Sequence, residues 1–319
     1  MRRDGDTIDT YDVYGTTLST SHRFSVPMRK RDGPADLVFH CTDEPPTDAP
    51  WEETLMVDAQ GVGADGDSVF LFAALPDRDV IRITGGLEFH LWPDRIVCHV
   101  LDGRHRYLVD IALLGMVYAL WLEQRGVPVL HGSAAVVGGV GAAFLAASGA
   151  GKSSLAAACV HAGHALLTED LLALDGTSGR PGYPMLRLWP EQAERFVGEG
   201  WAELDRARPD TAKLRVPVEA LGGSLWLGPA PLGRLYLPAR EARGCSIRSE
   251  PVPPQEALIA LVQHSFLPRE VHRWGLQPAR LAAFARLTAA VPVSRLHYPS
   301  GYDVLPEVVA FVDAELASR

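Results

Sequence analysis

The segment 146–153 combines residue types that bind phosphate. Its sequence, AASGAGKS, has Gly151, Lys152 and Ser153 at the fixed positions of GxxxxGK[ST], and Ala146 stands where that pattern begins with glycine. Such a loop wraps backbone N–H groups around a phosphate, while its lysine neutralises phosphate oxygens and its serine hydroxyl holds Mg²⁺. The pattern predicts a phosphate-binding loop made of Ser148, Gly149, Ala150, Gly151, Lys152, Ser153 and Ser154.

The residues on both sides of this loop have the periodicity that the motif requires. An apolar run at 142–147 predicts a strand before it, and 153–162 predicts a helix after it, ended by Gly163. The helix would point its N-terminus, with its partial positive charge, at the phosphate. The alternative, a flexible turn of small residues, would lack both flanking elements.

Two adjacent carboxylates follow closely. The run 165–168 predicts a strand that ends at Glu169 and Asp170. Near a bound triphosphate, one carboxylate can approach Mg²⁺ while the other takes the proton from an attacking hydroxyl. The alternative is a solvated turn at the end of a strand.

The stretch from Leu130-His131-Gly132 through the loop to Leu174 resembles the C-terminal domain of HPr kinase/phosphorylase. That family has a His-Gly strand, a hairpin, a glycine-rich loop, one helix and an acidic pair in this order. The resemblance implies the nucleotide-binding core shared with PEP carboxykinases, and ATP and Mg²⁺ as cofactors.

The resemblance also implies roles for individual residues. His131, Lys152, Glu169 and Asp170 would be catalytic, and Ser153 and Asp170 would hold the metal. His131 could equally be a core histidine at the end of a strand. The family usually has Asp-Asp where this chain has Glu169-Asp170, and its glycine-rich signature after the acidic pair is not found here.

Flanking segments resemble a divergent branch, the kinases of lasso-peptide and other ribosomal peptide pathways, which phosphorylate a serine of a precursor peptide. These segments are 113–115, 181–190 and 291–296. In the second of them, Tyr183 and Trp189 could line a peptide groove or pack against the sheet. Lys213 and Arg215 could bind the transferred phosphate, although a charged exposed strand also explains them.

The remaining elements predict an α/β fold in two domains. Short β-branched and aromatic runs at 69–73, 87–91 and 96–100 predict a small β-rich N-terminal domain, residues 1–107. A helix at 111–122, capped by Asp110, begins the kinase domain, residues 108–319. Gly138-Gly139 then predicts a hairpin turn between strands at 127–137 and 140–147, within a mixed sheet.

Composition limits the class of protein. The chain has 319 residues, a net charge of -9 and 47% hydrophobic residues, which favours a cytoplasmic globular protein over a nucleic-acid binder. No run is long enough to cross a membrane. The cysteines Cys41, Cys98, Cys159 and Cys245 lie far apart in the sequence and are expected to be buried thiols. The resembled family forms hexamers, which makes a homo-oligomer an expectation.

Together these patterns predict an ATP- and Mg²⁺-dependent kinase that transfers the γ-phosphate to a serine hydroxyl of a peptide, in a lasso or other ribosomal peptide pathway. Two alternatives stay open. One is a kinase for an HPr-like protein or a small metabolite. The other is a nucleotide-gated binding module that transfers no phosphate.

Overall fold

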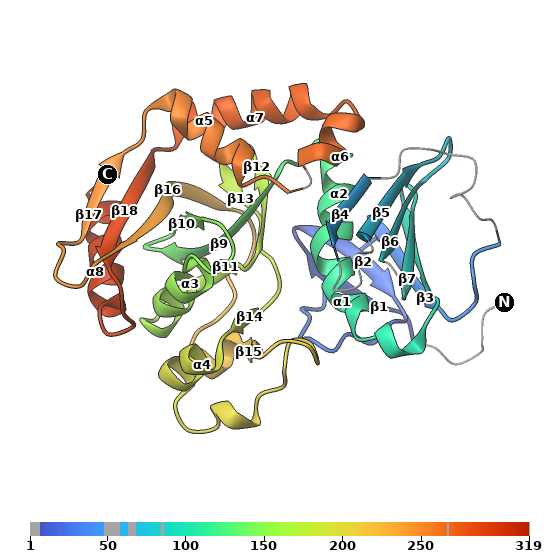
Figure 1. Ribbon diagram of the computed structural model, residues 1–319, viewed down its shortest axis with the longest axis horizontal. Coiled ribbons are helices and arrows are strands. Elements are labelled where there is room, and N and C mark those ends of the chain that lie inside the picture. The colour runs from blue at the N-terminus through green and yellow to red at the C-terminus, as the bar shows by residue number, and fades with distance from the viewer. Residues whose placement is uncertain (1–6, 48–57, 63–67, 84–85, 267, 319) are drawn as a thin grey trace. The chain divides into compact units, whose positions relative to one another are not determined.

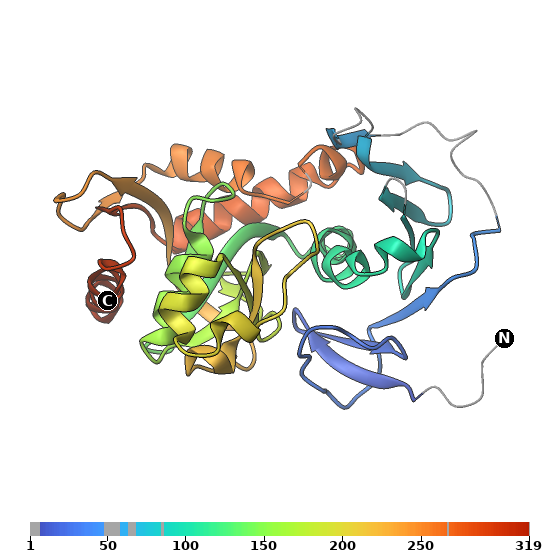
Figure 2. The ribbon, with the colours of Figure 1, turned by 60° about the horizontal axis from the view of Figure 1, so that its bottom comes forward.

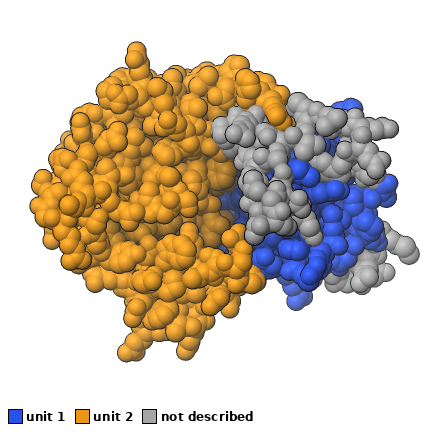
Figure 3. Space-filling view, viewed as in Figure 1, with its two compact units in different colours: residues 1–121 blue, residues 122–319 orange. Residues whose placement is uncertain are grey.

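The structure is a computed structural model that describes residues 7–47, 58–62, 68–83, 86–266 and 268–318. The other residues of the expected N-terminal domain, 1–6, 48–57, 63–67 and 84–85, lie outside the described residues. The chain divides into two compact units, residues 1–121 and 122–319, coloured separately in Figure 3. The sequence placed a boundary at 107/108, and the boundary between the units lies inside helix α2 (Tyr118–Glu123).

Unit 1 is built on one mixed sheet with the strand order β1-β2-β3-β8-β7-β6-β5-β4. The pairs β2–β3 and β3–β8 are parallel, and the other neighbours are antiparallel. The strands expected at 69–73, 87–91 and 96–100 are confirmed and correspond to β5, β7 and β8. The strands are β1 (Asp9–Val13), β2 (Thr16–Thr20), β3 (Leu37–Thr42), β4 (Asp58–Val62), β5 (Ser68–Ala74), β6 (Asp79–Ile83), β7 (Leu87–Leu91) and β8 (Arg95–Val100).

The helical segment after this sheet differs from the expected single helix at 111–122. A short 3-10 turn, η1 (Gly103–His105), precedes α1 (Leu108–Ala112), a π-helical turn, η2 (Leu113–Val117), and α2. Gly115 interrupts the helix with φ -107° and ψ -109°. Asp110 is not the cap, because its buried carboxylate accepts hydrogen bonds from Ser25 and His22 instead of from the first helical turn.

Unit 2 contains a second mixed sheet with the order β10-β9-β12-β13-β16-β18-β17. Strand β10 lies antiparallel to β9 and parallel to β16, and β11 also pairs with β9. A separate pair, β14–β15, is antiparallel. The strands are β9 (Val129–Val137), β10 (Val140–Leu145), β11 (Ala165–Thr168), β12 (Leu171–Asp175), β13 (Ser178–Gly179), β14 (Met185–Leu188), β15 (Leu214–Pro217), β16 (Ala230–Glu241), β17 (Arg248–Pro251) and β18 (Val293–Pro299).

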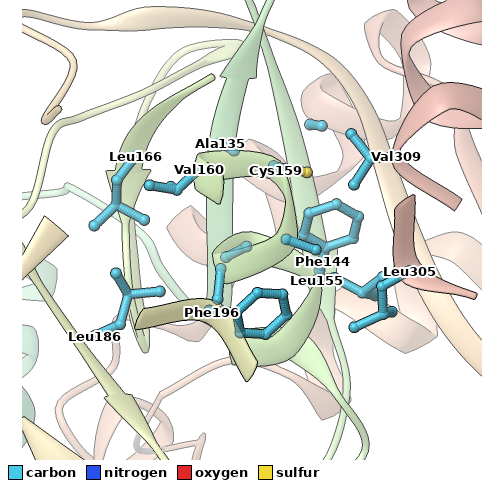
Figure 4. Packing of buried hydrophobic residues seen from close by; sticks show 14 of the residues in the cluster. Ala135, Phe144, Leu155, Cys159, Val160, Leu166, Leu186, Phe196, Leu305 and Val309 are labelled. Carbon is cyan, nitrogen blue, oxygen red and sulfur yellow. The ribbon is translucent and has the colours of Figure 1, made fainter. Parts of the chain in front are cut away.

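Both faces of this sheet are covered by helices (Figures 1 and 2). Successive residues of β9 and β10 alternate between two apolar clusters, as the period of two of a strand requires. Phe144 of β10 packs with Leu155 of α3 and Leu305 of α8 on one face, as Figure 4 shows. Leu145, the next residue, packs with residues of α5 and α7 on the other face.

The helices of unit 2 complete a mixed α/β fold, the class that the sequence predicted. The sequence has helical periodicity at 254–263, 278–290 and 305–316, and these segments correspond to α5, α7 and α8. The helical elements are α3 (Lys152–His161), α4 (Pro190–Val197), η3 (Trp201–Glu203), η4 (Val218–Leu221), α5 (Pro254–Gln263), α6 (Pro268–Arg273), α7 (Gln277–Ala290) and α8 (Leu305–Ala317). Among the described residues, none of the helices has the length and apolar character needed to cross a membrane.

Candidate functional site

The glycine-rich loop joins β10 to α3, as the sequence predicted. The hairpin before it turns at Gly138 and Gly139, with φ 57° and 88°. Within the loop, Gly149 and Gly151 have φ 80° and 103°, in the left-handed region that favours glycine. A Cβ on Gly151 would lie 2.9 Å from the Tyr298 hydroxyl oxygen, so this position has no room for a side chain. The loop backbone is therefore closely determined by its sequence.

Lys152 is the first residue of α3, and its side chain folds back over the loop. Nζ donates hydrogen bonds to the carbonyl oxygens of Ala146 at 2.6 Å and Ala147 at 3.2 Å. Burial lowers the pKa of Lys152, and the nearby charges of Asp170 and Glu169 oppose that shift. The ammonium group is thus held on the loop within electrostatic range of both carboxylates.

The two carboxylates lie on a link between two strands that pair with the same neighbour. Strands β11 and β12 both run antiparallel to β9, and Glu169 and Asp170 connect them. Asp170 has φ 71°, a left-handed conformation that is uncommon outside glycine but tolerated by Asp and Asn. The Thr168 hydroxyl donates to the Leu171 carbonyl at 2.6 Å and so closes the link. This local irregularity turns two consecutive carboxylates toward the loop.

Glu169 is the carboxylate next to the first turn of α3. It is 6% exposed, and its Oε1 accepts a hydrogen bond from the Ser153 hydroxyl at 2.8 Å. Burial raises the pKa of Glu169, although the Arg187 guanidinium, with Nη2 3.4 Å from Oε2, acts against that shift. A carboxylate and a hydroxyl are therefore brought together at the helix N-terminus.

Asp170 has different partners. Its Oδ2 accepts a hydrogen bond from Arg187 at 2.5 Å, and its Oδ1 lies 3.3 Å from His131 Nδ1. Burial acts to raise the pKa of Asp170, but the positive field of Arg187, His131 and Lys152 outweighs burial and lowers it. Asp170 is therefore held as a carboxylate, whereas burial favours the neutral form of Glu169.

Arg187 bridges the two carboxylates and was not assigned a role from the sequence. It lies on β14, and Asp170 raises its pKa well above the ordinary value despite burial. The signal available in the sequence was an arginine flanked by Leu186 and Leu188, both fully buried here. Successive side chains of a strand point to opposite faces, so this pattern places Arg187 on the face away from the core that Leu186 and Leu188 enter. No local pattern predicts its pairing with the acidic pair, because that contact joins separate strands.

His131 lies on β9 directly beside this cluster. Its backbone N–H donates to the His264 carbonyl at 2.6 Å. Its ring packs edge to face on Phe266, with ring centroids 5.3 Å apart. Burial lowers the pKa of His131, and Asp170 only partly offsets that effect. The imidazole is therefore more readily neutral than an exposed one, with Nδ1 facing Asp170.

The other loop residues, Ser148, Ala150 and Ser154, differ in their exposure. Ser148 is exposed and Ala150 is half-buried, so their backbone can reach a ligand. Ser154 is buried, and its Oγ accepts a hydrogen bond from Gln192 of α4 at 2.6 Å. Its hydroxyl is therefore engaged by α4.

Two cavities border the loop. One, of about 390 Å³, is lined by the loop residues Ala146, Ala147 and Ala150 together with His264 and Arg295. The other, of about 240 Å³, is lined by Gly151, Ser154, Arg240, Tyr298 and Tyr302. Both are large enough to hold part of a small ligand whose phosphates rest on the loop.

The donor set at the helix N-terminus suits Mg²⁺. Ser153 and Glu169 offer a hydroxyl and a carboxylate oxygen, which are the hard ligands that this ion prefers. Among the described residues, no group of three or more His, Cys, Asp or Glu side chains forms a metal site by itself. Mg²⁺ in phosphoryl-transfer sites takes its remaining ligands from phosphate oxygens and water, so two protein oxygens are compatible with it.

Comparison with known proteins shows a likeness to solved structures but none to a known sequence family. No family model matches the sequence, and no curated protein matches it. The structure is similar to a solved Hpr(Ser) kinase/phosphatase from Coxiella burnetii, with a TM-score of 0.30 and 10% sequence identity. The likeness covers 60% of this chain and 94% of that chain. A likeness this weak assigns no activity, which has to be argued from the residues of the site.

Proposed function

We propose that this protein is an ATP- and Mg²⁺-dependent kinase that transfers the γ-phosphate to a serine hydroxyl of a peptide. The observation that carries the proposal is the meeting of Lys152 and Ser153, at the start of α3, with Glu169 and Asp170 on the strand link. A phosphate cradle and a carboxylate within reach of its terminal group are the parts that phosphoryl transfer needs.

We assign different roles to the two carboxylates. Glu169, hydrogen-bonded to Ser153, would hold Mg²⁺ with that hydroxyl, and the ion would neutralise charge on the phosphates. Asp170, held as a carboxylate beside His131, would accept the proton of the acceptor hydroxyl. This differs from the expectation that Ser153 and Asp170 form the metal pair.

Arg187 and Lys152 would supply positive charge during transfer. In the structure Lys152 binds two loop carbonyls and Arg187 binds both carboxylates. Both groups can turn from these partners to phosphate oxygens, where charge-assisted hydrogen bonds stabilise the transition state.

A peptide acceptor is supported by the surface beside Arg187. Trp189 follows β14 directly and is 41% exposed, and Lys213 Nζ lies 5.5 Å from the centre of its ring. An exposed aromatic side chain of this kind anchors peptide partners. A lasso or other ribosomally made precursor is the peptide class that the sequence resemblance favours.

The experiment is phosphate transfer from γ-labelled ATP to serine peptides, with phosphoserine located by mass spectrometry. Lys152→Ala should weaken ATP binding about 10- to 100-fold, because it removes a charge-assisted contact. Asp170→Asn should leave ATP binding within about threefold and slow transfer about 100-fold or more, because it removes the general base. Lys30→Ala, an exposed lysine in unit 1, is the matched control and should change neither property.

The outcomes separate this proposal from its alternatives. Transfer to an HPr-like protein or a hydroxyl metabolite, with none to peptides, would replace the acceptor and leave the site intact. Nucleotide binding without transfer to any acceptor would identify a binding module. Unchanged ATP affinity and transfer in Lys152→Ala would refute the phosphate site itself.

A further inference from the structure

A second cluster of reactive groups lies in unit 1 and is separate from the site above. Cys41 on β3 and Cys98 on β8 are direct partners in the parallel ladder that joins these strands. Neighbouring strands are about 4.8 Å apart, and disulfides span Cα separations of about 4.4–6.8 Å. Because they occupy partnered positions of the ladder, the Cys98 thiol lies close enough to act on the electrostatics of Cys41. Cys98 is buried and Cys41 is partly exposed, so solvent reaches only one of them.

A histidine and a buried aspartate continue from Cys41. The His22 ring packs edge to face on Phe39, two residues before Cys41 on the same face of β3, with centroids 5.4 Å apart. Its Nε2 lies 2.7 Å from Asp110 Oδ1, and its ring is near enough to Cys41 for each group to shift the pKa of the other. Asp110 also accepts two hydrogen bonds from Ser25, at 2.6 Å each, which fix the carboxylate. The order thiol, imidazole, carboxylate is the arrangement that activates a cysteine nucleophile.

Arg106 adds a positive charge on the outer side of the thiol. Its Nη1 lies 3.9 Å from Cys41 Sγ, and its Nη2 binds Asp43. The groups that face Cys41 are thus His22, Cys98 and Arg106, with Asp110 and Asp43 behind two of them.

The electrostatic effect of this cluster agrees with its geometry. The Cys98 thiol, His22 and Arg106 lower the pKa of Cys41 to about 5, although burial opposes the shift. Burial alone would lower the pKa of His22, but Asp110 and Cys41 raise it to about 9. These shifts favour a Cys41 thiolate beside a His22 imidazolium at neutral pH.

We propose that Cys41 is a peroxide-reactive nucleophile and that Cys98 resolves its oxidised form to an intramolecular disulfide. The cluster supplies what such a site needs: an accessible sulfur, a proton donor beside it, and a second sulfur on the adjacent strand.

The reaction balances with hydrogen peroxide as the only co-reactant. The Cys41 thiolate attacks one peroxide oxygen, the O–O bond breaks, and the leaving hydroxide takes a proton from His22 to form water. Cys41 is then a sulfenic acid. The Cys98 sulfur attacks the Cys41 sulfur, the S–O bond breaks, and the second hydroxide leaves with the Cys98 proton as water. Two thiols lose two electrons, and one peroxide becomes two waters.

The first test compares two cysteines of the same full-length chain. Cys245 is also partly exposed, but burial and the Glu241 carboxylate raise its pKa. With iodoacetamide, the labelling rate of Cys41 should change less than about threefold between pH 6.5 and 8.5, because the thiolate is already formed. The rate for Cys245 should rise about tenfold per pH unit over the same range. In His22→Gln, the labelling rate of Cys41 should rise with pH. A Cys41 labelling rate that rises with pH in the native chain would refute the activated thiol.

The second test follows the products. The native chain, treated with hydrogen peroxide and digested without reduction, should yield a peptide pair linked through Cys41 and Cys98. In Cys98→Ala, dimedone should trap a sulfenic acid on Cys41, whereas Cys245→Ala should behave as the native chain. A Cys41 that stays reduced while other thiols oxidise would overturn the proposal. A trapped sulfenic acid in the native chain without the linked peptide would overturn the resolving role of Cys98. The linked-peptide measurement needs no variant, so a folding defect in Cys98→Ala does not affect it.

Discussion

At the residue scale, the pKa values of two adjacent carboxylates are shifted in opposite directions: that of Glu169 is raised and that of Asp170 is lowered. Glu169 is buried and Asp170 is partly exposed. Asp170 receives the short hydrogen bond from Arg187 and the field of His131, while Glu169 has the Ser153 hydroxyl and a longer contact to Arg187. Such a separation of pKa values is typical of sites where two acids have different tasks. It fits the proposal in which the proton acceptor and the metal-side carboxylate are different residues.

The raised pKa of Glu169 leads to a prediction about stability. Because its folded pKa lies above its unfolded value, the stability it contributes is full below about pH 4.5 and is lost as the pH rises through the folded pKa. Glu169→Gln removes the cost of keeping a charged carboxylate buried at high pH, and it keeps an acceptor for the Ser153 hydroxyl. The variant should melt above the native chain at pH 8, and the difference should shrink toward pH 4.5.

Thermal unfolding at both pH values measures this difference. Glu194→Gln, on the exposed side of α4, is the matched control and should show little difference at either pH. A pH-independent difference for Glu169→Gln would contradict the assigned shift. Its loss of phosphate transfer would at the same time show that the charge is retained for chemistry at the expense of stability.

At the element scale, the link between β11 and β12 depends on a close backbone approach. Gly182 donates its N–H to the Leu167 carbonyl at 2.8 Å, and a Cβ there would lie 2.6 Å from the Thr168 hydroxyl oxygen. Gly182→Ala should therefore displace Thr168, whose hydroxyl closes the link, at a cost of about 1–3 kcal/mol.

We expect Gly182→Ala to reduce phosphate transfer more than nucleotide affinity, because the loop itself is not touched. Transfer rate, ATP binding and thermal unfolding measure the three effects. Gly103→Ala is the control, since a Cβ at Gly103 meets nothing within 4 Å. Equal loss of affinity and transfer in Gly182→Ala would indicate that the loop and the link move together.

The elements that sequence periodicity predicted are those formed by local contacts. The hairpin at Gly138-Gly139, helix α3 and strand β11 are in this class, as are α5, α7 and α8. The alignment of β11 and β12 along one strand, and the arrival of Arg187 at their junction, depend on contacts between distant segments. The same is true of Cys41 and Cys98, expected as separate buried thiols and found opposite each other, with Cys41 partly exposed. A single sequence carries no pattern for such pairings.

At the scale of the whole molecule, each unit has its own buried residues and its own sheet. The proposed nucleotide site lies entirely in unit 2, and the cysteine cluster lies entirely in unit 1. A ligand that binds only the folded state stabilises what it binds, by about 2.7 kcal/mol at 100 times its dissociation constant. Hydrogen exchange can therefore locate the site within the chain without any substitution.

With ADP or a non-hydrolysable ATP analogue and Mg²⁺, exchange should slow most in β10, α3 and the β11–β12 link. For amides of unit 2 that exchange by its full opening, the slowing should approach about 100-fold at that ligand concentration, because 1.4 kcal/mol corresponds to a factor of ten. The strands β6–β8 of unit 1 should change little. Lys152→Ala, which weakens binding about 10- to 100-fold, should reduce this slowing in unit 2 to between about twofold and tenfold at the same ligand concentration. Equal protection of both units would show that they unfold as one cooperative body. Protection confined to unit 1 would show that the nucleotide does not bind at Lys152, and would refute the proposed site.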